Sequence, residues 1–434
     1  MYLEQRLSFF NPVSFNLATN SILGTTQRWA IDRTWPIEEI LIFLNFDITT
    51  AVRTATTSAT PDQADNLMQL LAHINLTVND GRQPRSVVDC SGVAMLEYVS
   101  NCGWNLDTAT NLFCLMCQNA VGGVAANVIP VGTYQVCYRV PCAPVQVGEP
   151  LRSRLYLPVH TYPQDPVLTL QFNSLTNLAT QAGVIGTVRV DVVLVRRLPT
   201  KQSEDKLRST AGSNPTGYID WDLIETPFSL PLGTASEVRL PIPVPGNYCE
   251  LLFRQYKGGA TVGTGVSRTN TIDVDVGDTI ANNLGLETRW RLESGGVVMR
   301  EWRWKHLRAL NDFTKPQVPA APALTPLLVA ANGGSATDVL QPANFPALSM
   351  GSIIGTGATT AFRAGTSVML PFLNDGLTGD SGNELGSLLD TNTPANNGLK
   401  MEIIGTQANV ATSPNVLAVM GRRLFGDISR WQMF

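Results

Sequence analysis

The chain has 434 residues, which is long for a single hydrophobic core, so two domains are expected. Its hydrophobic fraction of 44% suits a folded globular protein, whereas its charged fraction of 15% is low for a soluble domain. The net charge of −4 argues against a dominant nucleic-acid-binding role, so no sequence-specific nucleic acid is expected as a partner. The low charge leaves two explanations open: a neutral β surface covered by Ser, Thr and Asn, or a surface largely buried against other subunits.

Residues 1–28 show little periodicity and are predicted to form an N-terminal arm. A loosely docked tail is the favoured interpretation, and an arm that reaches a neighbour is the alternative. The first residues lack the basic segment and apolar core of a signal peptide, and Pro12 interrupts them. No apolar run approaches the roughly 20 residues of a membrane-spanning helix.

Alternating apolar residues predict that most of the ordered chain is β-strand. The first clear strand places Ile40, Ile42, Leu44, Phe46 and Ile48 on one face. A helix is predicted after Thr60, with Pro61 at its first position, and a second helix over roughly 107–121. Asp80-Gly81 predicts a hairpin, and further strands are expected at 133–140, 152–157, 221–224, 237–242 and 247–256.

The segment from Leu155 to Leu198 is matched, in the same order, by a second segment from Val368 to Phe425. The matched points are Leu157-Pro158 with Leu370-Pro371, Ala179-Thr180 with Ala411-Thr412, and Arg196-Arg197-Leu198 with Arg422-Arg423-Leu424. A fourth point is the hairpin before Glu97-Tyr98, matched by the Gly295-Gly296 hairpin before Glu301-Trp302. Matches in conserved order indicate a duplicated domain.

The predicted fold is therefore all-β, with two tandem jelly-roll sandwiches or barrels and short helical insertions. The polar segment after the first copy has no apolar periodicity and is the predicted linker between the copies. The predicted division is 1–28 arm, 29–198 first jelly roll, 199–217 linker, 218–425 second jelly roll and 426–434 C-terminal tail.

Cysteines and histidines do not predict a metal or redox site. The seven cysteines are Cys90, Cys102, Cys114, Cys117, Cys137, Cys142 and Cys249, and the histidines are His73, His160 and His306. Cys114-x-x-Cys117 lacks a second pair at zinc spacing and lies among apolar residues, so core packing is favoured. Neither a metal nor a cofactor is expected, and small buried thiols suit a protein made in a cytoplasm.

Two further groups of residues were considered as sites. Asp220, Asp222 and Glu225 could supply the paired acids of a glycosidase, but solvent-facing acids on a strand are the favoured interpretation. Arg300–Arg308 interleaves basic residues with Trp302 and Trp304, a pattern that can stack nucleic-acid bases. Its strict alternation favours a strand with one packed face, and no catalytic residues are assigned.

Taken together, the duplicated all-β unit resembles the double jelly-roll major capsid proteins of tailless, membrane-containing bacterial viruses, the tectivirus–adenovirus lineage. The resemblance covers residues 30–425 and rests on RTWPIEEILIFLNFD, RWRLESGGVVMREWRW and GRRLFGDISRWQMF. It implies a homotrimer whose six jelly rolls form a pseudo-hexagonal capsomer in the icosahedral shell of a virion. It further implies contacts with neighbouring capsomers, with penton or minor proteins, and with an internal viral membrane at the base.

Two other functions remain open from the residues alone. A virion spike or tandem β-sandwich carbohydrate-binding module would present Trp302 or Trp304 on an exposed concave patch. A carbohydrate-active enzyme would use the three acids near Asp222.

Overall fold

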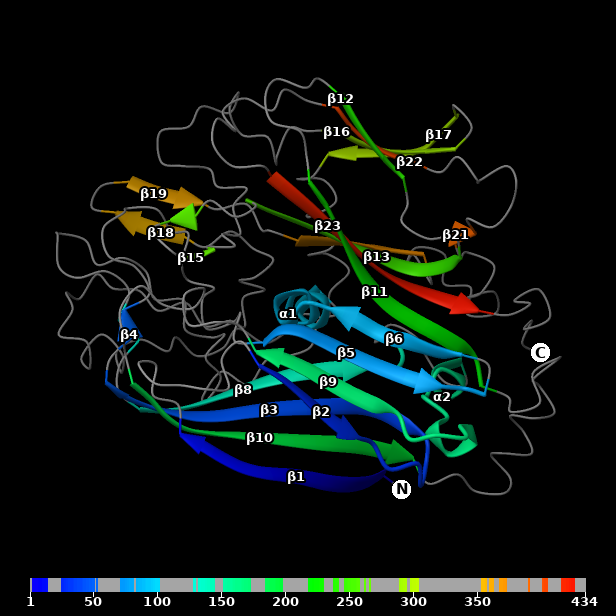
Figure 1. Ribbon diagram of the computed structural model, residues 1–434. Coiled ribbons are helices and arrows are strands. Elements are labelled where there is room, and N and C mark those ends of the chain that lie inside the picture. Colours follow the sequence, from blue (N-terminus) through cyan, green and yellow to red (C-terminus); the bar gives the residue numbers. More distant parts are fainter. Residues whose placement is uncertain are drawn as a thin grey trace.

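The fold is seen in a computed structural model that describes most of the predicted strands (Figure 1). The described residues are 2–14, 25–50, 52–53, 71–81, 83–101, 128–129, 132–144, 151–172, 184–197, 218–229, 237–241, 246–257, 261–262, 265–266, 289–294, 297–303, 353–356, 359–362, 367–372, 389–390, 400–404 and 415–425.

The first half of the chain supplies two four-stranded sheets. Its long strands are β1 (Tyr2–Ser14), β2 (Thr26–Ala30), β3 (Ile37–Thr50), β5 (Leu71–Asn79), β6 (Pro84–Cys90), β8 (Gly132–Pro141), β9 (Val167–Phe172) and β10 (Val184–Arg197). They pair in the orders β1-β10-β3-β8 and β2-β9-β5-β6. Counted one to eight along the chain, the strands therefore form the sheets 1-8-3-6 and 2-7-4-5, which is the topology of a jelly roll.

The second half repeats this topology strand for strand. Its long strands are β11 (Asp220–Ser229), β12 (Glu237–Pro241), β13 (Asn247–Lys257), β16 (Arg289–Ser294), β17 (Val297–Arg303), β20 (Ser367–Pro371), β22 (Lys400–Ile404) and β23 (Asn415–Phe425). They pair as β11-β23-β13-β20 and β12-β22-β16-β17, again 1-8-3-6 and 2-7-4-5. The chain is thus a double jelly roll, and the two sets of strands are called here the first and second units.

Short elements lie between the long strands. The strand pairs are β4 (Val52–Arg53) with β7 (Val128–Ile129), β14 (Thr261–Val262) with β15 (Gly265–Val266), and β18 (Ile353–Thr356) with β19 (Thr359–Phe362), while β21 (Leu389–Asp390) pairs with β13. The helices among the described residues are α1 (Gly92–Asn101), α2 (Leu151–Arg154) and the short 3-10 helix η2 (Val159–Thr161). Among the described segments, no helix is long and apolar enough to cross a membrane.

The core of the first unit lies between its two sheets. On β3, Ile40, Ile42 and Leu44 are fully buried, and they lie opposite Leu194, Val192 and Val190 of β10. The facing sheet contributes the buried alternate residues of β5 and β9, including Ile74, Leu76, Leu168 and Leu170. This period of two is the pattern expected when one face of each strand is packed.

The two units share one continuous sheet. Strand β6 pairs in parallel with β11 through Leu223 opposite Val88 and Ile224 opposite Asp89. This contact joins the second sheet of the first unit to the first sheet of the second unit, giving a nine-stranded sheet that includes β21. In Figure 1 this sheet passes through the middle of the molecule, beside α1.

A bulge at the same place in both units shows which residues of the two units correspond to each other. On β3 the pairing with β10 skips Glu38, between Ile37 opposite Arg196 and Glu39 opposite Val195. On β13 the pairing with β23 skips Cys249 in the same way, between Tyr248 opposite Arg423 and Glu250 opposite Arg422. The skipped carbonyls also match, since that of Glu38 accepts from Cys142 N (3.0 Å) and that of Cys249 accepts from Phe372 N (2.8 Å).

This register confirms part of the predicted duplication and corrects the rest. The two Arg-Arg strands, β10 and β23, are both eighth strands, but Arg196 corresponds to Arg423, so the Arg-Arg-Leu match is one residue out of register. Pro371 ends β20, and Pro141 ends its counterpart β8. The two prolines correspond because Pro371 lies opposite Glu250 and Pro141 lies opposite Glu39, which are equivalent residues. The match of Leu157-Pro158 with Leu370-Pro371 is therefore wrong.

The hairpin match is half right. Strands β5–β6 and β16–β17 are the fourth and fifth strands of their units, as the duplication requires. The Glu-aromatic pairs after them differ, because Tyr98 lies on α1 and Trp302 on β17. Ala179-Thr180 and Ala411-Thr412 lie outside the described residues.

Several local predictions are also tested. The Asp80-Gly81 hairpin is confirmed, and Gly81 has a φ of 91°, a conformation that favours glycine. The predicted strand 152–157 is wrong: residues 151–154 form α2, and Leu157 makes only an isolated bridge to Ile37. The helices predicted after Thr60 and over 107–121 lie in parts of the chain that the structure does not describe.

The N-terminal arm also differs from expectation. Residues 2–14, predicted to be a loosely docked tail, form β1, which pairs antiparallel with β10 and is the first strand of the first jelly roll. The predicted linker 199–217 and tail 426–434 lie outside the described residues.

The close approach of Tyr248 to Gly421 gives a test of packing in the second unit. A Cβ on Gly421 would lie 2.5 Å from Cε1 of the buried Tyr248. We predict that Gly421→Ala lowers the free energy of unfolding by about 1–3 kcal/mol, because a packed core resists added volume. Urea denaturation measures it; Tyr248→Leu in the same chain should recover part of the loss, and an unchanged midpoint for Gly421→Ala would contradict the packing.

Candidate functional site: the buried junction between the two units

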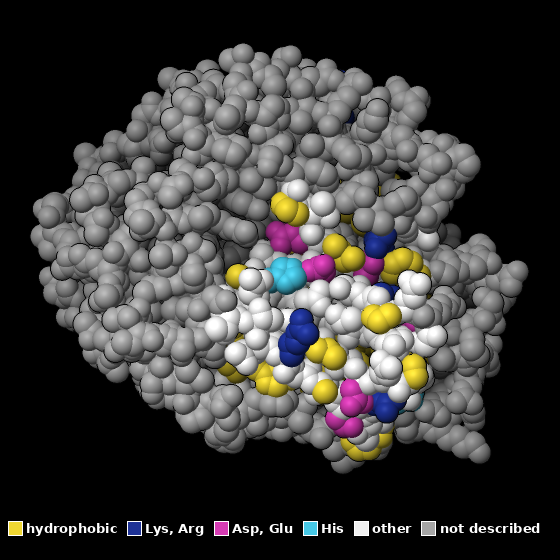
Figure 2. Space-filling model, viewed as in Figure 1, with side chains coloured by type: hydrophobic (Ala, Val, Ile, Leu, Met, Phe, Trp, Pro, Cys, Tyr) yellow, Lys and Arg dark blue, Asp and Glu magenta, His cyan; other side chains and the backbone are white. Residues whose placement is uncertain are grey.

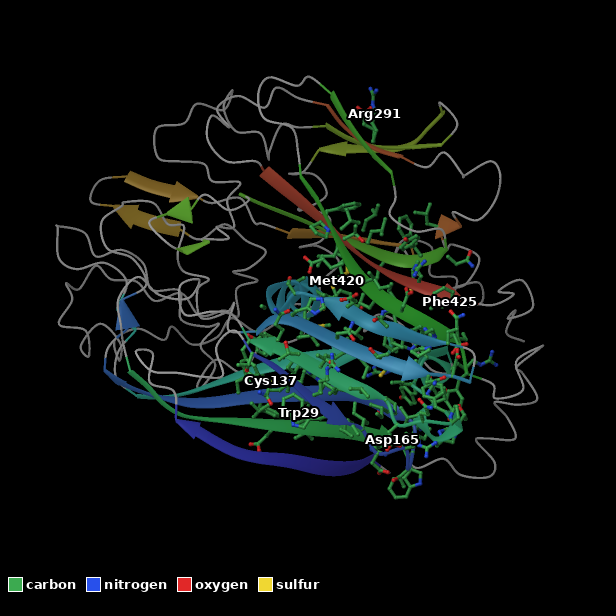
Figure 3. The ribbon with its side chains drawn as sticks, in the orientation of Figure 1. Trp29, Cys137, Asp165, Arg291, Met420 and Phe425 are labelled. Carbon is green, nitrogen blue, oxygen red and sulfur yellow. The ribbon has the colours of Figure 1, made fainter. Side chains whose placement is uncertain are left out.

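A cluster of deeply buried charges lies where the second unit packs on the first. Arg422 and Arg423 are consecutive on β23, so their side chains leave opposite faces of the sheet. Arg422 points toward the first unit, and Arg423 lies on the other face with Asp222 and Tyr248. Figure 3 labels Met420 and Phe425, which flank the two arginines on β23 above α1 and β6.

The Arg422 guanidinium is fully buried and binds groups from both units. It donates to Glu250 Oε1 (3.1 Å) in the second unit, and to the carbonyls of Pro141 and Cys142 (2.8 Å each) in the first. It also donates to the Tyr98 hydroxyl of α1 (3.1 Å), and that hydroxyl donates in turn to Glu250. One side chain thereby connects α1, the end of β8 and β13.

Aromatic rings enclose the same guanidinium. Its central carbon lies 4.5 Å from the centroid of the Trp221 ring and 5.7 Å from that of Tyr98. Cation–π contacts strengthen when the cation is removed from water, as it is here.

The electrostatics of the cluster follow from burial and from these contacts. Burial raises the pKa of Glu250, against the opposing effects of Arg422 and the Tyr98 hydroxyl. Burial alone would lower the pKa of Arg422, but the interactions with Tyr98 and Glu250 outweigh it and raise that pKa. Arg422 is therefore a permanent buried cation, and removing its partners would leave an uncompensated charge.

Arg423 forms the corresponding pair inside the second unit. Its Nε donates to Asp222 Oδ1 (2.9 Å), and its Nη2 donates to Asp222 Oδ2. Burial raises the pKa of Asp222, and Arg423 opposes that effect. The two residues are directly opposite on β11 and β23, which allows the bidentate geometry.

Strand β11 and the residue before it carry further polar contacts of the junction. Trp221 Nε1 donates to the Leu155 carbonyl (2.7 Å), and Ile219 N donates to the Arg154 carbonyl (2.8 Å). Glu225 accepts from Ser91 N (2.7 Å), and Arg85 donates to the Trp221 carbonyl (3.0 Å). Each of these bonds joins one unit to the other, so together they fix the angle between the two units.

The three acids considered as glycosidase residues belong to this junction. Asp220 pairs with Arg85 (3.3 Å), Asp222 with Arg423, and Glu225 with Ser91 N. The expectation that they are solvent-facing is wrong for Asp222, which is only 3% exposed. Its carboxylate can be buried because Arg423 neutralises its charge. The geometry thus gives each carboxylate a partner in the structure of the chain.

The prediction of small buried thiols is confirmed for three of the four cysteines that the structure describes. Cys90, Cys142 and Cys249 are buried, Cys137 is partly exposed, and all four are free thiols. Burial raises the pKa of Cys137 and of Cys142 to about 12 and that of Cys249 well above its usual value, so these thiols stay protonated. Cys102, Cys114 and Cys117 are not among the described residues.

Of the histidines, His73 bonds Asp89 (2.6 Å) and His160 packs edge-on against Tyr218, while His306 is not described. In the described part of the chain, no cluster of three or more His, Cys, Asp or Glu residues could hold a metal ion. On the face shown in Figure 2, the described acidic and basic side chains are scattered among hydrophobic side chains and among the white atoms of other side chains and backbone.

The basic–aromatic segment is described only in part. Its first residues lie on β17, where Arg291 of β16 bonds Glu301 (Nε to Oε2, 2.5 Å), as the predicted hairpin requires. Trp304 lies outside the described residues, and the side chain of Trp302 is not described, so the predicted exposed aromatic patch stays a prediction.

The two side chains that hydrogen-bond Arg422, Tyr98 and Glu250, were both missed as site residues by sequence reasoning. Glu250 carried a signal, since it is a lone acid within the apolar run Tyr248–Phe253. Helix α1 also carried one: Ser91 caps it, with its Oγ accepting from Ala94 N (3.2 Å). That the two meet at Arg422 depends on the register between the units, which no local pattern contains.

Breaking the buried pair should destabilise the chain strongly. We predict that Arg422→Met lowers the free energy of unfolding by about 3–5 kcal/mol, because Glu250 is left buried without its cation. Adding Glu250→Leu should cost much less than the sum of the two single changes. Denaturant unfolding of the single and double variants measures this coupling.

A matched control is the exposed pair Arg33–Asp165, whose side chains are 39% and 50% accessible. Asp165→Asn should change stability by less than about 1 kcal/mol. Equal effects at Arg422 and Asp165 would contradict the assigned role of the junction.

The Trp221 bond tests the contact with α2 separately. Trp221→Phe keeps an aromatic ring near Arg422 but leaves the Leu155 carbonyl without its donor, for an expected loss of about 1–3 kcal/mol. Trp35→Phe at a half-buried position is the control, and thermal unfolding is the measurement. A Trp221→Phe protein as stable as the control would show that the bond contributes nothing.

Comparison with known proteins shows similarity in structure alone. No family model matches the sequence, and no curated protein matches it. The STIV MCP matches 97% of this chain and 96% of its own, with 15% identity and a TM-score of 0.51. A chain from the atomic structure of Sulfolobus Turreted Icosahedral Virus matches 96% and 90%, with 13% identity and a TM-score of 0.53. The Faustovirus major capsid protein matches 98% and 90%, with 9% identity and a TM-score of 0.51. These likenesses, over nearly whole chains, show that the double jelly-roll fold is shared with viral capsid proteins.

Proposed function

We propose that this chain is the major capsid protein of an icosahedral virus and acts as a structural subunit without enzymatic activity. The observation that carries the proposal is the repetition of one complete jelly-roll topology within a single chain. Full-length likeness to the Faustovirus major capsid protein and the STIV MCP supports it.

The duplication suits a subunit that tiles a shell. Three copies of a two-unit chain supply six similar jelly rolls, which can surround one axis as a pseudo-hexagon. The buried junction supports this role, because Arg422 and the bonds of β11 hold the two units at one angle. A fixed angle is what repeated tiling requires and what a flexible two-domain binder lacks.

The composition supports extensive contacts with other subunits. Only 15% of residues are charged, and interface cores are depleted of charged residues. The proposed partners are two further copies in a homotrimer, neighbouring capsomers, and penton or minor proteins. By its resemblance to the lineage, the capsomer base would face an internal viral membrane, and the protein would be located in the virion after synthesis in the host cytoplasm.

The proposal is tested by the oligomeric state of the purified full-length chain. Size-exclusion chromatography with light scattering should give three times the chain mass of 47.0 kDa, and electron micrographs should show hexagonal particles. A stable monomer that forms no larger assembly at high concentration would contradict the proposed function.

A further inference from the structure

Each unit presents a strand edge that has no partner among the described strands. In the first unit, β1 pairs only with β10, and in the second unit β17 pairs only with β16. Figure 1 places β1 and β17 at opposite ends of the molecule. The two edges therefore cannot meet within one chain, and open edges of this kind are templates for pairing with another chain.

The junction within the chain shows what such edges bind. Strands β6 and β17 are both fifth strands of their units, and β11 and β1 are both first strands. Within the chain, the edge of β6 pairs in parallel with the edge of β11. The equivalent contact for the two open edges is β17 of one copy against β1 of the next.

The sheet face beside β1 also has an equivalent in the junction. In the second unit, the face of β23-β13 that carries Arg422 and Glu250 is covered by the first unit. By the shared bulge, Glu250 corresponds to Glu39 and Arg422 to Val195. The corresponding face of the first unit is the outer face of β10-β3-β8.

That outer face carries apolar residues that are only half-buried within the chain. They are Leu41, Phe43, Val193, Val195 and Cys137, all of intermediate exposure; Figure 3 labels Cys137 on this sheet. Charged residues share this face: Arg139 and Glu39 neutralise each other, because Arg139 Nη2 donates to Glu39 Oε2 (3.0 Å) and Arg139 Nε donates to Oε1. Asp191, opposite Phe43, is already buried within the chain at 4% exposure. The Glu39–Arg139 pair therefore opposes burial of the exposed part of this face less than a single charge would.

We propose that this face and the β1 edge bind the second unit of another copy of this chain, which repeats between chains the junction seen within one. The partner is a second copy because its β17 edge is the counterpart of β6, the strand that fills this place in the junction. The proposal rests on the proposed function and gives it residue-level content. The contact is head-to-tail, so it closes into a ring when the rotation between copies matches that between units.

The internal register predicts which residues meet. Leu3 of β1 lies opposite Arg196, and Asp222 of β11 lies opposite Arg423, the counterpart of Arg196. Leu3 therefore corresponds to Asp222, and the next residue, Glu4, corresponds to Leu223. The hairpins β5–β6 and β16–β17 each contain one bulge. When the two bulges are aligned, Arg300 of β17 corresponds to Val88 of β6.

Since Val88 pairs with Leu223, the predicted neighbour of Glu4 is Arg300 of the next copy. These two positions carry opposite charges, which favours the pairing.

The first test places a charge on the proposed face. Leu41 lies opposite Arg139 on β8, so Leu41→Glu offers that arginine a second carboxylate and leaves the single chain able to fold. We expect its trimer to dissociate at a protein concentration at least tenfold higher than that of the wild type. Thr169→Glu, on the outward face of β9, is the matched control and should leave the trimer unchanged.

The second test reverses the predicted pair. Glu4→Arg and Arg300→Glu should each weaken the trimer, and the double variant should restore most of the wild-type dissociation constant, as measured by analytical ultracentrifugation. Restoration is specific to positions that meet between copies, so general unfolding cannot mimic it.

The outcomes separate the two proposals. A wild-type chain that is monomeric would contradict the proposed function itself. A wild-type trimer that is unaffected by Leu41→Glu, or that is weakened equally by Thr169→Glu, would overturn only the assigned interface. A double variant weaker than either single variant would overturn the predicted register.

Discussion

The burial of one guanidinium governs how this chain is built. Arg422 has no access to solvent, so each donor that it presents must find an acceptor within the protein. Those acceptors come from β13, from the end of β8 and from α1, which lie in different units. The cation is satisfied only when both units are folded and docked, so the relative placement of the units becomes part of the folded state.

The two units share their topology, a bulge and a proline at the end of the sixth strand. They nevertheless differ in which sheet faces are buried. The face of the second unit that carries Arg422 is covered by the first unit, whereas the matching face at Leu41 and Val195 is only half-buried. The same asymmetry holds for the strand edges, since β11 has a partner in β6 and no described strand pairs with the second edge of β1. A duplicated chain that satisfies one junction internally leaves one junction for a neighbour, and the low charge of the sequence agrees with this arrangement.

Sequence reasoning reached the fold class because strands reveal themselves by alternation, as at Ile40, Ile42 and Leu44. It also placed the hairpin at Asp80-Gly81, where turn chemistry is local. It missed what depends on pairing between distant segments: the role of residues 2–14 as β1, the one-residue offset between the Arg-Arg strands, and the burial of Asp222. A charged residue on a strand looks solvent-facing until the structure shows the arginine that neutralises it.

The most direct test of the account is a residue-level electron cryomicroscopy reconstruction of the purified oligomer. We predict a ring of three chains in which β17 of each copy pairs in parallel with β1 of the next, with Arg300 beside Glu4. In that ring, the second unit of the neighbour should cover the outer face around Leu41 and Val195. A ring in which the copies meet through the outward face of β2-β9-β5-β6, with β1 left unpaired, would contradict the claim that one junction is used twice.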